Sequence, residues 1–245
     1  MLDGRFWIRW LAVNLVLAAL IAVVGWWPVT TRAGIDYRWS EKRIPLAEKF
    51  LGFVTRDLQS RRLAIEVTAD VEDEQERLLR IFRWVTASVR PVPAGFPVVD
   101  DHLFHILVRG YGTSDQRTEA FALLASHAGF PSSRIVLEAA SGGARLQIAV
   151  VKWRGKLHLL DVDNGVVFRT ATGALASIDD LQKEPAIIRA AGGRRAVDGV
   201  RYEIFFRRLE DLRPAFTRIE AQRPWSRLRL ELARVFRALA GAERQ

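Results

Sequence analysis

The sequence predicts an α+β domain behind one N-terminal transmembrane helix and ahead of a C-terminal amphipathic helix. Three observations carry this prediction. The chain begins with a long apolar run, continues with segments of helical periodicity, and then changes to short segments in which apolar and polar residues alternate. Helices followed by a series of consecutive strands are typical of α+β folds. The 245 residues, of which 49% are hydrophobic, suffice for one ordinary domain with an appendage.

The apolar run spans residues 10–29, WLAVNLVLAALIAVVGWWPV, and Asn14 is its one strongly polar side chain. About 20 residues at about 1.5 Å per residue cross a hydrocarbon core of about 30 Å. Tryptophans lie near both ends of this run, where interfacial aromatic belts are expected: Trp7, Trp10, Trp26 and Trp27. A cleaved signal peptide is the alternative, but it needs a shorter apolar core and a site of small residues. The bulky sequence GWWPVTTRAG favours an uncleaved signal anchor.

Arginines predict the orientation of this anchor. Arg5 and Arg9 precede the run, which places the N-terminus in the cytoplasm, although Arg32 and Arg38 beyond it reduce the asymmetry. No second run of this kind follows in the sequence. We therefore expect a single-pass protein of a bacterial inner membrane, with residues 1–30 as cytoplasmic tip and anchor and the main domain in the periplasm.

Residues 31–70 are expected to form a helical stalk or linker. IPLAEKFLGFVTRDL predicts an amphipathic helix that tolerates Pro45 in its first turn. One face of that helix carries Leu46, Phe50, Phe53 and Val54. LAIEVTAD, residues 63–70, alternates briefly and predicts a short strand or an extended linker.

Two helices open the domain predicted for residues 71–209. DVEDEQERLLRIFRWVTASVRPVP predicts a helix with Asp70 as N-cap, an acidic first turn and a stop at Pro91. Its buried stripe should consist of Leu78, Ile81, Phe82, Val85 and Val89. A second helix is predicted from Ser114 to His127, ended by Gly129-Phe130-Pro131. Its inward residues should be Phe121, Leu124 and Ala128.

After this second helix, apolar residues recur at every second position, as they do in β-strands. RIVLEAA, RLQIAVVKW, KLHLLDVD and VVFRT predict consecutive strands, and Arg154-Gly155 should turn the central hairpin. ASIDDLQKEPAIIRAAGG predicts short helices and loops, and residues 201–209, RYEIFFRRL, a last strand.

The segment 210–245 contains a predicted basic amphipathic helix from Trp225 to Ala240. Its apolar face carries Trp225, Leu228, Leu232, Val235, Phe236 and Leu239. Such a helix lies on an anionic membrane surface, docks onto a partner, or packs on its own domain with solvated arginines. The candidate contact residues are Trp225, Arg227, Leu228, Arg234 and Arg237.

Composition excludes several classes of function. The chain has no cysteine, so disulfides, thiolate catalysis and cysteine-bound metals are excluded. The net charge of +9 is compatible with binding to an anionic partner. However, no block of five or more Lys and Arg and no nucleic-acid-binding motif accompanies it. We expect no nucleic acid and no cofactor, and the predominance of Arg over Lys also fits codon bias in a GC-rich genome.

The histidines offer weak metal and catalytic candidates. His102, His105 and Asp101 in DDHLFH could bind a metal, although a solvated or capping cluster is the favoured interpretation. His158 alternates with leucines along a predicted strand and should face solvent. If it faced Ser114 instead, with Asp161 or Asp163 behind it, a serine triad would result.

The stretch GYGTSDQRTEAFALL, residues 110–124, carries a family resemblance. A G-x-G-x-x-D-Q junction before a helix, then Gly129-Phe130-Pro131, then a hairpin ending in LLDVD, resembles the transglutaminase-like core over about residues 71–170. That family has a papain-like α+β fold and includes many bacterial members that are not transglutaminases. The resemblance implies a cysteine at the start of the central helix, a histidine on the next long strand and an aspartate beyond the hairpin turn.

These three positions fall on different residue types here. The cysteine position falls on Ser114 and the aspartate position on Asp161. The histidine position falls on Leu146, or on Gln147 with a shift of one residue. A serine needs an adjacent base to act as nucleophile, and losing thiol and base should cost on the order of 10³-fold or more in rate. We therefore expect no catalytic residues, with Thr113 and Gln116 capping the helix and Asp161 bonding backbone or an arginine.

Three functions are compatible with these features. The leading hypothesis is a catalytically inactive transglutaminase-like scaffold or regulatory subunit of a membrane complex of the envelope or exopolysaccharide type, as the resemblance to anchored bacterial members implies. The first alternative is an active periplasmic hydrolase or acyltransferase that uses Ser114. The second is a polysaccharide-binding module. Partners in these hypotheses are the membrane, another protein subunit, an acidic polysaccharide or an anionic lipid.

Overall fold

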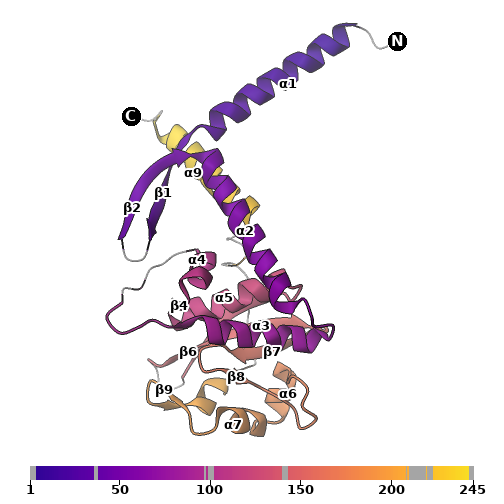
Figure 1. The fold of residues 1–245 in the computed structure, drawn as a ribbon, viewed down its shortest axis with the longest axis vertical. Coiled ribbons are helices and arrows are strands. Elements are labelled where there is room, and N and C mark those ends of the chain that lie inside the picture. Colours follow the sequence, from indigo (N-terminus) through magenta and orange to yellow (C-terminus); the bar gives the residue numbers. More distant parts are fainter. Residues whose placement is uncertain are drawn as a thin grey trace. The chain divides into compact units, whose positions relative to one another are not determined.

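The computed structural model describes residues 4–35, 38–96, 98, 102–139, 143–207, 209, 219 and 223–242. The chain forms two compact units, which are described separately. The first consists of Met1–Thr55 and Arg223–Gln245, and the second of Arg56–Gln222. Figure 1 labels the elements of both units.

Helix α1 (Gly4–Gly25) is the apolar helix that the sequence predicts. Its residues Phe6–Gly25 are long and apolar enough to cross a membrane, with a mean hydropathy of 2.2 and none of the stretch buried. The helix ends at Gly25 and not at residue 29, because Pro28 disfavours helical backbone at the residue before it. The Asn14 amide donates a hydrogen bond to the Trp10 carbonyl at 2.7 Å, so the helix itself satisfies part of this polar group.

A β-hairpin follows α1. Strands β1 (Pro28–Ile35) and β2 (Arg38–Pro45) pair antiparallel, with Pro28 opposite Pro45. The stalk or linker predicted for residues 31–70 thus contains a hairpin before its helix. Helix α2 (Leu46–Thr68) begins directly after the hairpin, and helix α9 (Pro224–Ala242) completes the first unit.

A small apolar core joins the elements of the first unit. It consists of Val29, Leu46 and Val235, against which Val24, Trp27, Leu228 and Leu232 pack. Beside it, Lys49 and the buried Glu231 form an ion pair with an N–O distance of 2.9 Å. The predicted apolar face of α9 is therefore divided: Val235 is buried, whereas Trp225 and Phe236 are exposed. The side chain of Leu239 lies outside the described residues.

Helix α2 continues to Thr68, so the strand or extended linker predicted for residues 63–70 is wrong. Ala64 and Thr68 are buried at a spacing of four residues, and Leu63 and Val67 pack against the same core. The Thr68 hydroxyl also donates a hydrogen bond to the Ala64 carbonyl at 2.8 Å. Tertiary packing at helical spacing thus outweighs the strand preference of the β-branched residues.

Helix α3 (Glu74–Ser88) is capped by Asp73, whose side chain accepts a hydrogen bond from the Glu76 N–H at 2.8 Å. The N-cap predicted at Asp70 is therefore wrong, and the Asp70 carboxylate lies 3.6 Å from the Arg80 guanidinium. The predicted stripe is confirmed, because these residues are all buried: Leu78, Ile81, Phe82, Val85 and Val89. A short parallel pair, β3 (Arg90–Pro91) and β4 (Tyr111–Gly112), flanks helix α4 (Leu103–Arg109).

Helix α5 (Ser114–His127) has the predicted limits and is buried on every side from Gln116 to Ala125. Phe121 lies at its centre and contacts Phe82 of α3 edge to face, with ring centroids 5.9 Å apart. The positive φ of Gly129, +94°, turns the chain out of the helix.

Four antiparallel strands form the sheet of the second unit, in the order β5-β6-β7-β8. They are β5 (Ser132–Glu138), β6 (Arg145–Trp153), β7 (Lys156–Asp161) and β8 (Val166–Val167). The predicted turn at Arg154-Gly155 is confirmed, with positive φ at both residues, as a type I′ hairpin requires. Figure 1 shows α3 and α5 on one face of the sheet and helices α6 (Ile178–Lys183) and α7 (Ala186–Gly192) on the other.

The strand predicted for residues 201–209 is wrong. Residues Tyr202–Phe206 form a 3-10 helix, η1, which follows the two-residue strands β9 (Ala196–Val197) and β10 (Val200–Arg201). The buried residues Tyr202, Phe205 and Phe206 are spaced as on one side of a helix, and this spacing decides the conformation. Helices and an antiparallel sheet nevertheless make up the unit, so the predicted α+β class is confirmed.

Candidate functional site

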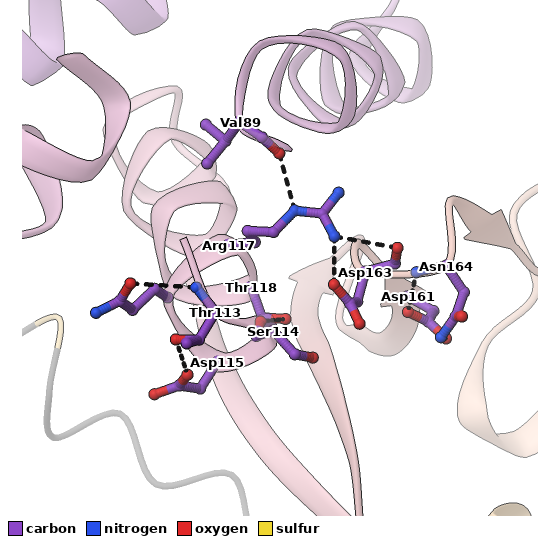
Figure 2. A network of polar contacts seen from close by, with 10 residues as sticks. Val89, Thr113, Ser114, Asp115, Arg117, Thr118, Asp161, Asp163 and Asn164 are labelled. Carbon is purple, nitrogen blue, oxygen red and sulfur yellow. Dashed lines mark hydrogen bonds and ion pairs between the residues drawn. The ribbon is translucent and has the colours of Figure 1, made fainter. Parts of the chain in front are cut away.

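Ser114 is the first residue of α5, and its surroundings are those of a capped helix. The Gln116 side-chain oxygen accepts a hydrogen bond from the Thr113 N–H at 3.2 Å, as predicted for this pair. The Thr113 hydroxyl donates to the Asp115 carboxylate, and the Ser114 carbonyl accepts from the Thr118 hydroxyl at 2.8 Å (Figure 2). The first of these bonds satisfies a backbone N–H that the start of a helix leaves open, and the other two hold polar side chains of the first turn.

The register of β6 decides which of the two candidate base positions faces α5. Ala149 and Val151 pack in the same hydrophobic cluster as the residues of α5, whereas Leu146 packs in the cluster on the opposite face. Since side chains alternate along a strand, Gln147 shares the face of Ala149. Of the two positions, Gln147 is thus the one on the side of Ser114.

Gln147 is held in a polar network. The Arg134 guanidinium donates to the Gln147 side-chain oxygen at 2.5 Å and to the Glu119 carboxylate at 2.9 Å. Glu119 lies on α5 and is buried. An amide neither takes up nor releases a proton near neutral pH, so Gln147 offers hydrogen bonds and no base.

Asp161 faces away from α5. Leu160 packs in the α5 cluster, whereas Leu159 packs in the opposite one, and alternation places Asp161 with Leu159. Its carboxylate accepts hydrogen bonds from the Tyr202 hydroxyl at 2.7 Å and from the backbone and side-chain amides of Asn164, both at 2.9 Å. The expected backbone bond of Asp161 is therefore confirmed, and its carboxylate ties η1 to the sheet.

Burial has the largest effect on the pKa values of Asp161 and Tyr202. It raises the pKa of Asp161, although the three hydrogen bonds oppose this effect. Burial also raises the pKa of Tyr202, and the neighbouring Asp161 adds to the increase. The phenol consequently keeps its proton and serves as a donor to the carboxylate.

Replacing Tyr202 with Phe should lower the free energy of unfolding by about 1–3 kcal/mol, because a buried carboxylate oxygen loses one donor. The measurement is denaturant unfolding of the full chain in detergent micelles. The cost should shrink in an Asp161→Asn background, where no charge is left without its partner. Equal costs in both backgrounds would show that the hydroxyl does not act through Asp161.

Arg117 and Asp163 form an ion pair that sequence reasoning missed. The guanidinium of the buried Arg117 donates to the Val89 carbonyl at 2.8 Å and to the Asp163 carbonyl at 3.2 Å, and it pairs with the Asp163 carboxylate. Figure 2 shows Arg117 reaching from α5 to the loop that holds Asp163. One signal could have found it: apolar residues occupy every face of this helix, which indicates burial all round, and a buried arginine needs partners.

His158 is buried, so its predicted exposure to solvent is wrong. The register pairs it with Val151, on the α5 face of the sheet, and its ring contacts Trp153 with centroids 5.4 Å apart. Its Nδ1 lies 3.1 Å from the Ala176 carbonyl. The segment around Ala176 covers this position, and local alternation could not reveal that cover.

The contribution of His158 to the stability of the protein should fall as the pH drops below about 6.5. Burial lowers the pKa of His158 from its ordinary 6.5, so the unfolded chain takes up the proton first. The contribution is complete above pH 6.5 and is lost as the pH falls from 6.5 through the folded-state pKa, at up to about 1.4 kcal/mol per unit. Unfolding free energies at pH 7.5 and 5.5 should differ less in His158→Gln, which keeps a donor for Ala176 and does not titrate. An unchanged difference would contradict this assignment.

The described residues around His102 and His105 do not form a metal site. His102 is the N-cap of α4, and its Nδ1 accepts a hydrogen bond from the Phe104 N–H at 3.1 Å. The rings of His102 and His105 have centroids 6.0 Å apart, and Asp101 lies outside the described residues. Among the residues that the structure describes, no group of three or more His, Asp or Glu could hold a metal ion.

The serine triad weighed from sequence is likewise not assembled. Within the described ranges, no hydrogen bond links an imidazole nitrogen to the Ser114 hydroxyl. His158 lies near the turn that begins β7, whereas Asp161 ends that strand and faces the other side of the sheet. Among the residues that the structure describes, the polar groups held by hydrogen bonds and ion pairs in this region are thus the capped start of α5, the Gln147 amide and two ion-paired arginines.

No family model matches the chain, and no curated protein matches it in sequence. Three solved structures are similar to it in part. One from Parabacteroides distasonis, described as a proposed protease, covers 54% of this chain at 15% identity and a TM-score of 0.35. One from Cytophaga hutchinsonii, described as a proposed cysteine protease, covers 51% at 13% identity and a TM-score of 0.38. One described as a TGase covers 65% at 14% identity and a TM-score of 0.38.

The chain spans 35%, 44% and 49% of the length of these three proteins, respectively. The chain itself has a mixed helix-and-sheet fold, with an N-terminal helix that is long and apolar enough to cross a membrane.

Proposed function

We propose that this chain is a catalytically inactive transglutaminase-like protein, anchored in the inner membrane by α1, which acts as a scaffold or regulatory subunit of a membrane complex of the envelope or exopolysaccharide type. One observation carries the inactive part of the proposal. The residue on the α5 face of β6, on the side of Ser114, is the amide Gln147, and Arg134 holds its oxygen at 2.5 Å.

Proton transfer is the step that this arrangement does not support. A serine hydroxyl becomes a nucleophile when a neighbouring base accepts its proton and a third group orients that base. Gln147 is not a base, and Asp161 is bound to Tyr202 and Asn164 on the opposite face of the sheet. Ser114 therefore remains an ordinary alcohol at the start of a helix.

The polar groups around the site support a structural role for it. Arg117 bridges the end of α3 and the loop after β7, while Arg134 bridges α5 and β6. Buried hydrogen-bond and ion-pair networks of this kind favour one arrangement of their elements. A domain whose former catalytic region is rigid and unreactive is suited to present a constant surface to a partner. The exopolysaccharide setting rests on the resemblance of the sequence to anchored bacterial members.

The membrane location rests on α1 and its flanks. The exposed apolar stretch Phe6–Gly25 can span a bilayer, and Trp7, Trp10 and Trp26 lie near its ends. Arg5 and Arg9 favour a cytoplasmic N-terminus and hence a periplasmic domain.

An activity-based probe tests the inactive site. The full chain, purified in detergent, is treated with a fluorophosphonate that modifies activated serines, and adducts are located by mass spectrometry. We expect no adduct at Ser114, and wild type, Ser114→Ala and the same-helix control Ser126→Ala should behave alike, while an active serine hydrolase in the same tube is labelled. An adduct on Ser114 that disappears only in Ser114→Ala would replace our proposal with the hydrolase.

Crosslinking in host membranes tests the scaffold role. The tagged full chain and its Ser114→Ala variant are crosslinked in cells, solubilised and purified. We expect both to recover the same membrane proteins in comparable amounts, because partner binding does not require the hydroxyl. Recovery of the chain alone would contradict a scaffold, and loss of partners in Ser114→Ala would indicate that the site itself is used.

A further inference from the structure

Helix α9 exposes an apolar stripe although its other side is buried in the first unit. Trp225 is 69% exposed and Phe236 60% exposed, and Leu230 is 44% exposed on another part of the surface. Trp225, Leu232 and Phe236 follow one another at intervals of seven and four residues and so lie along one line of the helix. Leu232 is partly buried against the small apolar core of the first unit, so the exposed members are Trp225 and Phe236. Single exposed apolar residues are ordinary, but two large aromatic residues in one stripe are not.

The exposed surface of α9 is also positively charged. Arg229, Arg234 and Arg237 are all exposed. Within the described part of the helix, Glu231 is the acidic residue, and it is buried against Lys49 and bonded to Arg234. Outward-facing charges on this part of α9 are therefore those of arginine, next to aromatic rings, as in helices that lie in a membrane interface.

The buried side of α9 shares a core with the end of α1. Val24 and Trp27 pack together with Leu228, Leu232 and Val235. A Cβ at Gly25 would lie 3.5 Å from the Cβ of Ala47, so α1 also ends directly on α2. Because α1 is the helix suited to span the bilayer, α9 is fixed within its own unit to the residues at the membrane boundary.

We propose that the exposed face of α9 binds the surface of a bilayer that contains anionic phospholipids. Aromatic side chains such as those of Trp225 and Phe236 partition into the interface, and each arginine near an anionic surface contributes attraction. The anchor keeps this surface permanently within reach, so the encounter is intramolecular and needs no high affinity. This inference rests on α1 as an anchor and does not depend on whether Ser114 is reactive.

The absence of cysteine allows a clean test in the full chain. Three alanines on exposed helix surfaces are replaced singly by cysteine and spin-labelled: Ala233 on the outward face of α9, Ala190 on α7 of the second unit, and Ala18 within α1. The proteins are reconstituted into two kinds of vesicle. One consists of phosphatidylcholine alone, and the other of phosphatidylcholine with 30% phosphatidylglycerol. Relative accessibility to oxygen and to a water-soluble nickel chelate reports the depth of each label.

We expect the Ala233 label in phosphatidylglycerol vesicles to lie between the lipid value of Ala18 and the aqueous value of Ala190. The value should move toward the aqueous one in vesicles without phosphatidylglycerol. An Ala233 label as aqueous as Ala190 in both vesicles overturns the proposal. A label shielded from both reagents would indicate contact with a second copy and would overturn it as well, and equal depth in the two vesicles would overturn the anionic part.

Removing charge without changing the buried face provides the matched variant. Arg229→Gln with Arg237→Gln alters two exposed arginines and leaves the pair of Glu231 with Lys49 intact. Two charges should lower the ratio of bound to unbound α9 on the order of 30-fold. The Ala233 label should then approach the Ala190 value, while the Ala18 value and the circular dichroism spectrum stay unchanged. An unaltered Ala233 depth in this variant would contradict lipid recognition by arginine.

Discussion

Replacing Asp163 with Ala should lower the free energy of unfolding by about 3 kcal/mol, because it leaves the buried Arg117 guanidinium without its counter-charge. Breaking a buried pair by removing one partner costs about 3–5 kcal/mol. The low end applies here, since the carbonyls of Val89 and residue 163 still accept from the guanidinium. Urea unfolding of the full chain in detergent micelles, followed by tryptophan fluorescence, measures the effect.

The opposite substitution should cost less. In Arg117→Met the side chain that remains is Asp163, which is 32% exposed and can be hydrated, while Met fills most of the vacated volume. The double variant should be more stable than the sum of the single effects predicts. Arg80→Met, which breaks the exposed pair with Asp70, serves as control and should cost less than about 1 kcal/mol. If Asp163→Ala were as mild as this control, the buried charge would not need its partner.

Phe121→Ala should be at least as destabilising, at about 3–5 kcal/mol. The ring is fully buried at the centre of α5 and contacts Phe82, and neighbours held by helix and sheet cannot close the cavity. The same unfolding measurement applies. Stability within about 1 kcal/mol of wild type would mean that the core around α5 rearranges freely.

Two variants separate the cavity from the loss of any aromatic ring. Phe121→Leu retains most of the volume and should cost less than Phe121→Ala by at least about 1 kcal/mol. Phe96→Ala removes a ring that is 44% exposed and should cost less than about 1 kcal/mol. A cost for Phe96→Ala as large as that for Phe121→Ala would indicate a general effect of removing phenylalanine.

The sequence predicted correctly those elements in which the spacing of apolar residues agrees with the residues that start and end the element. The limits of α5 follow from Thr113 before it and Gly129 after it, and the β6–β7 turn follows from Arg154-Gly155 between alternating segments. Where these two kinds of signal disagree, tertiary contacts decide whether the segment forms a helix or a strand. Residues 63–68 have β-branched members but bury Ala64 and Thr68 on one helical side, and Tyr202, Phe205 and Phe206 do the same within η1.

The candidate site was predictable in position but not in orientation. The start of α5 and the strand that supplies Gln147 follow from sequence. Which way Asp161 faces depends on the register of β7, and a shift of one residue moves every side chain to the other face. His158 illustrates the same limit, because the segment that covers it at Ala176 comes 18 residues later.

Under the proposed function, the network of Gln147, Arg134 and Glu119 makes the gain of a catalytic histidine costly. A histidine at position 147 would remove the amide oxygen that is one of the two acceptors of Arg134, the other being the buried Glu119. A cysteine at position 114 alone would gain no base. A carboxylate able to orient such a histidine would have to stand on the α5 face of β7, where Leu160 now packs in the hydrophobic core. Under the proposed function, a gain of catalysis would therefore require several substitutions together, each of which disturbs buried contacts.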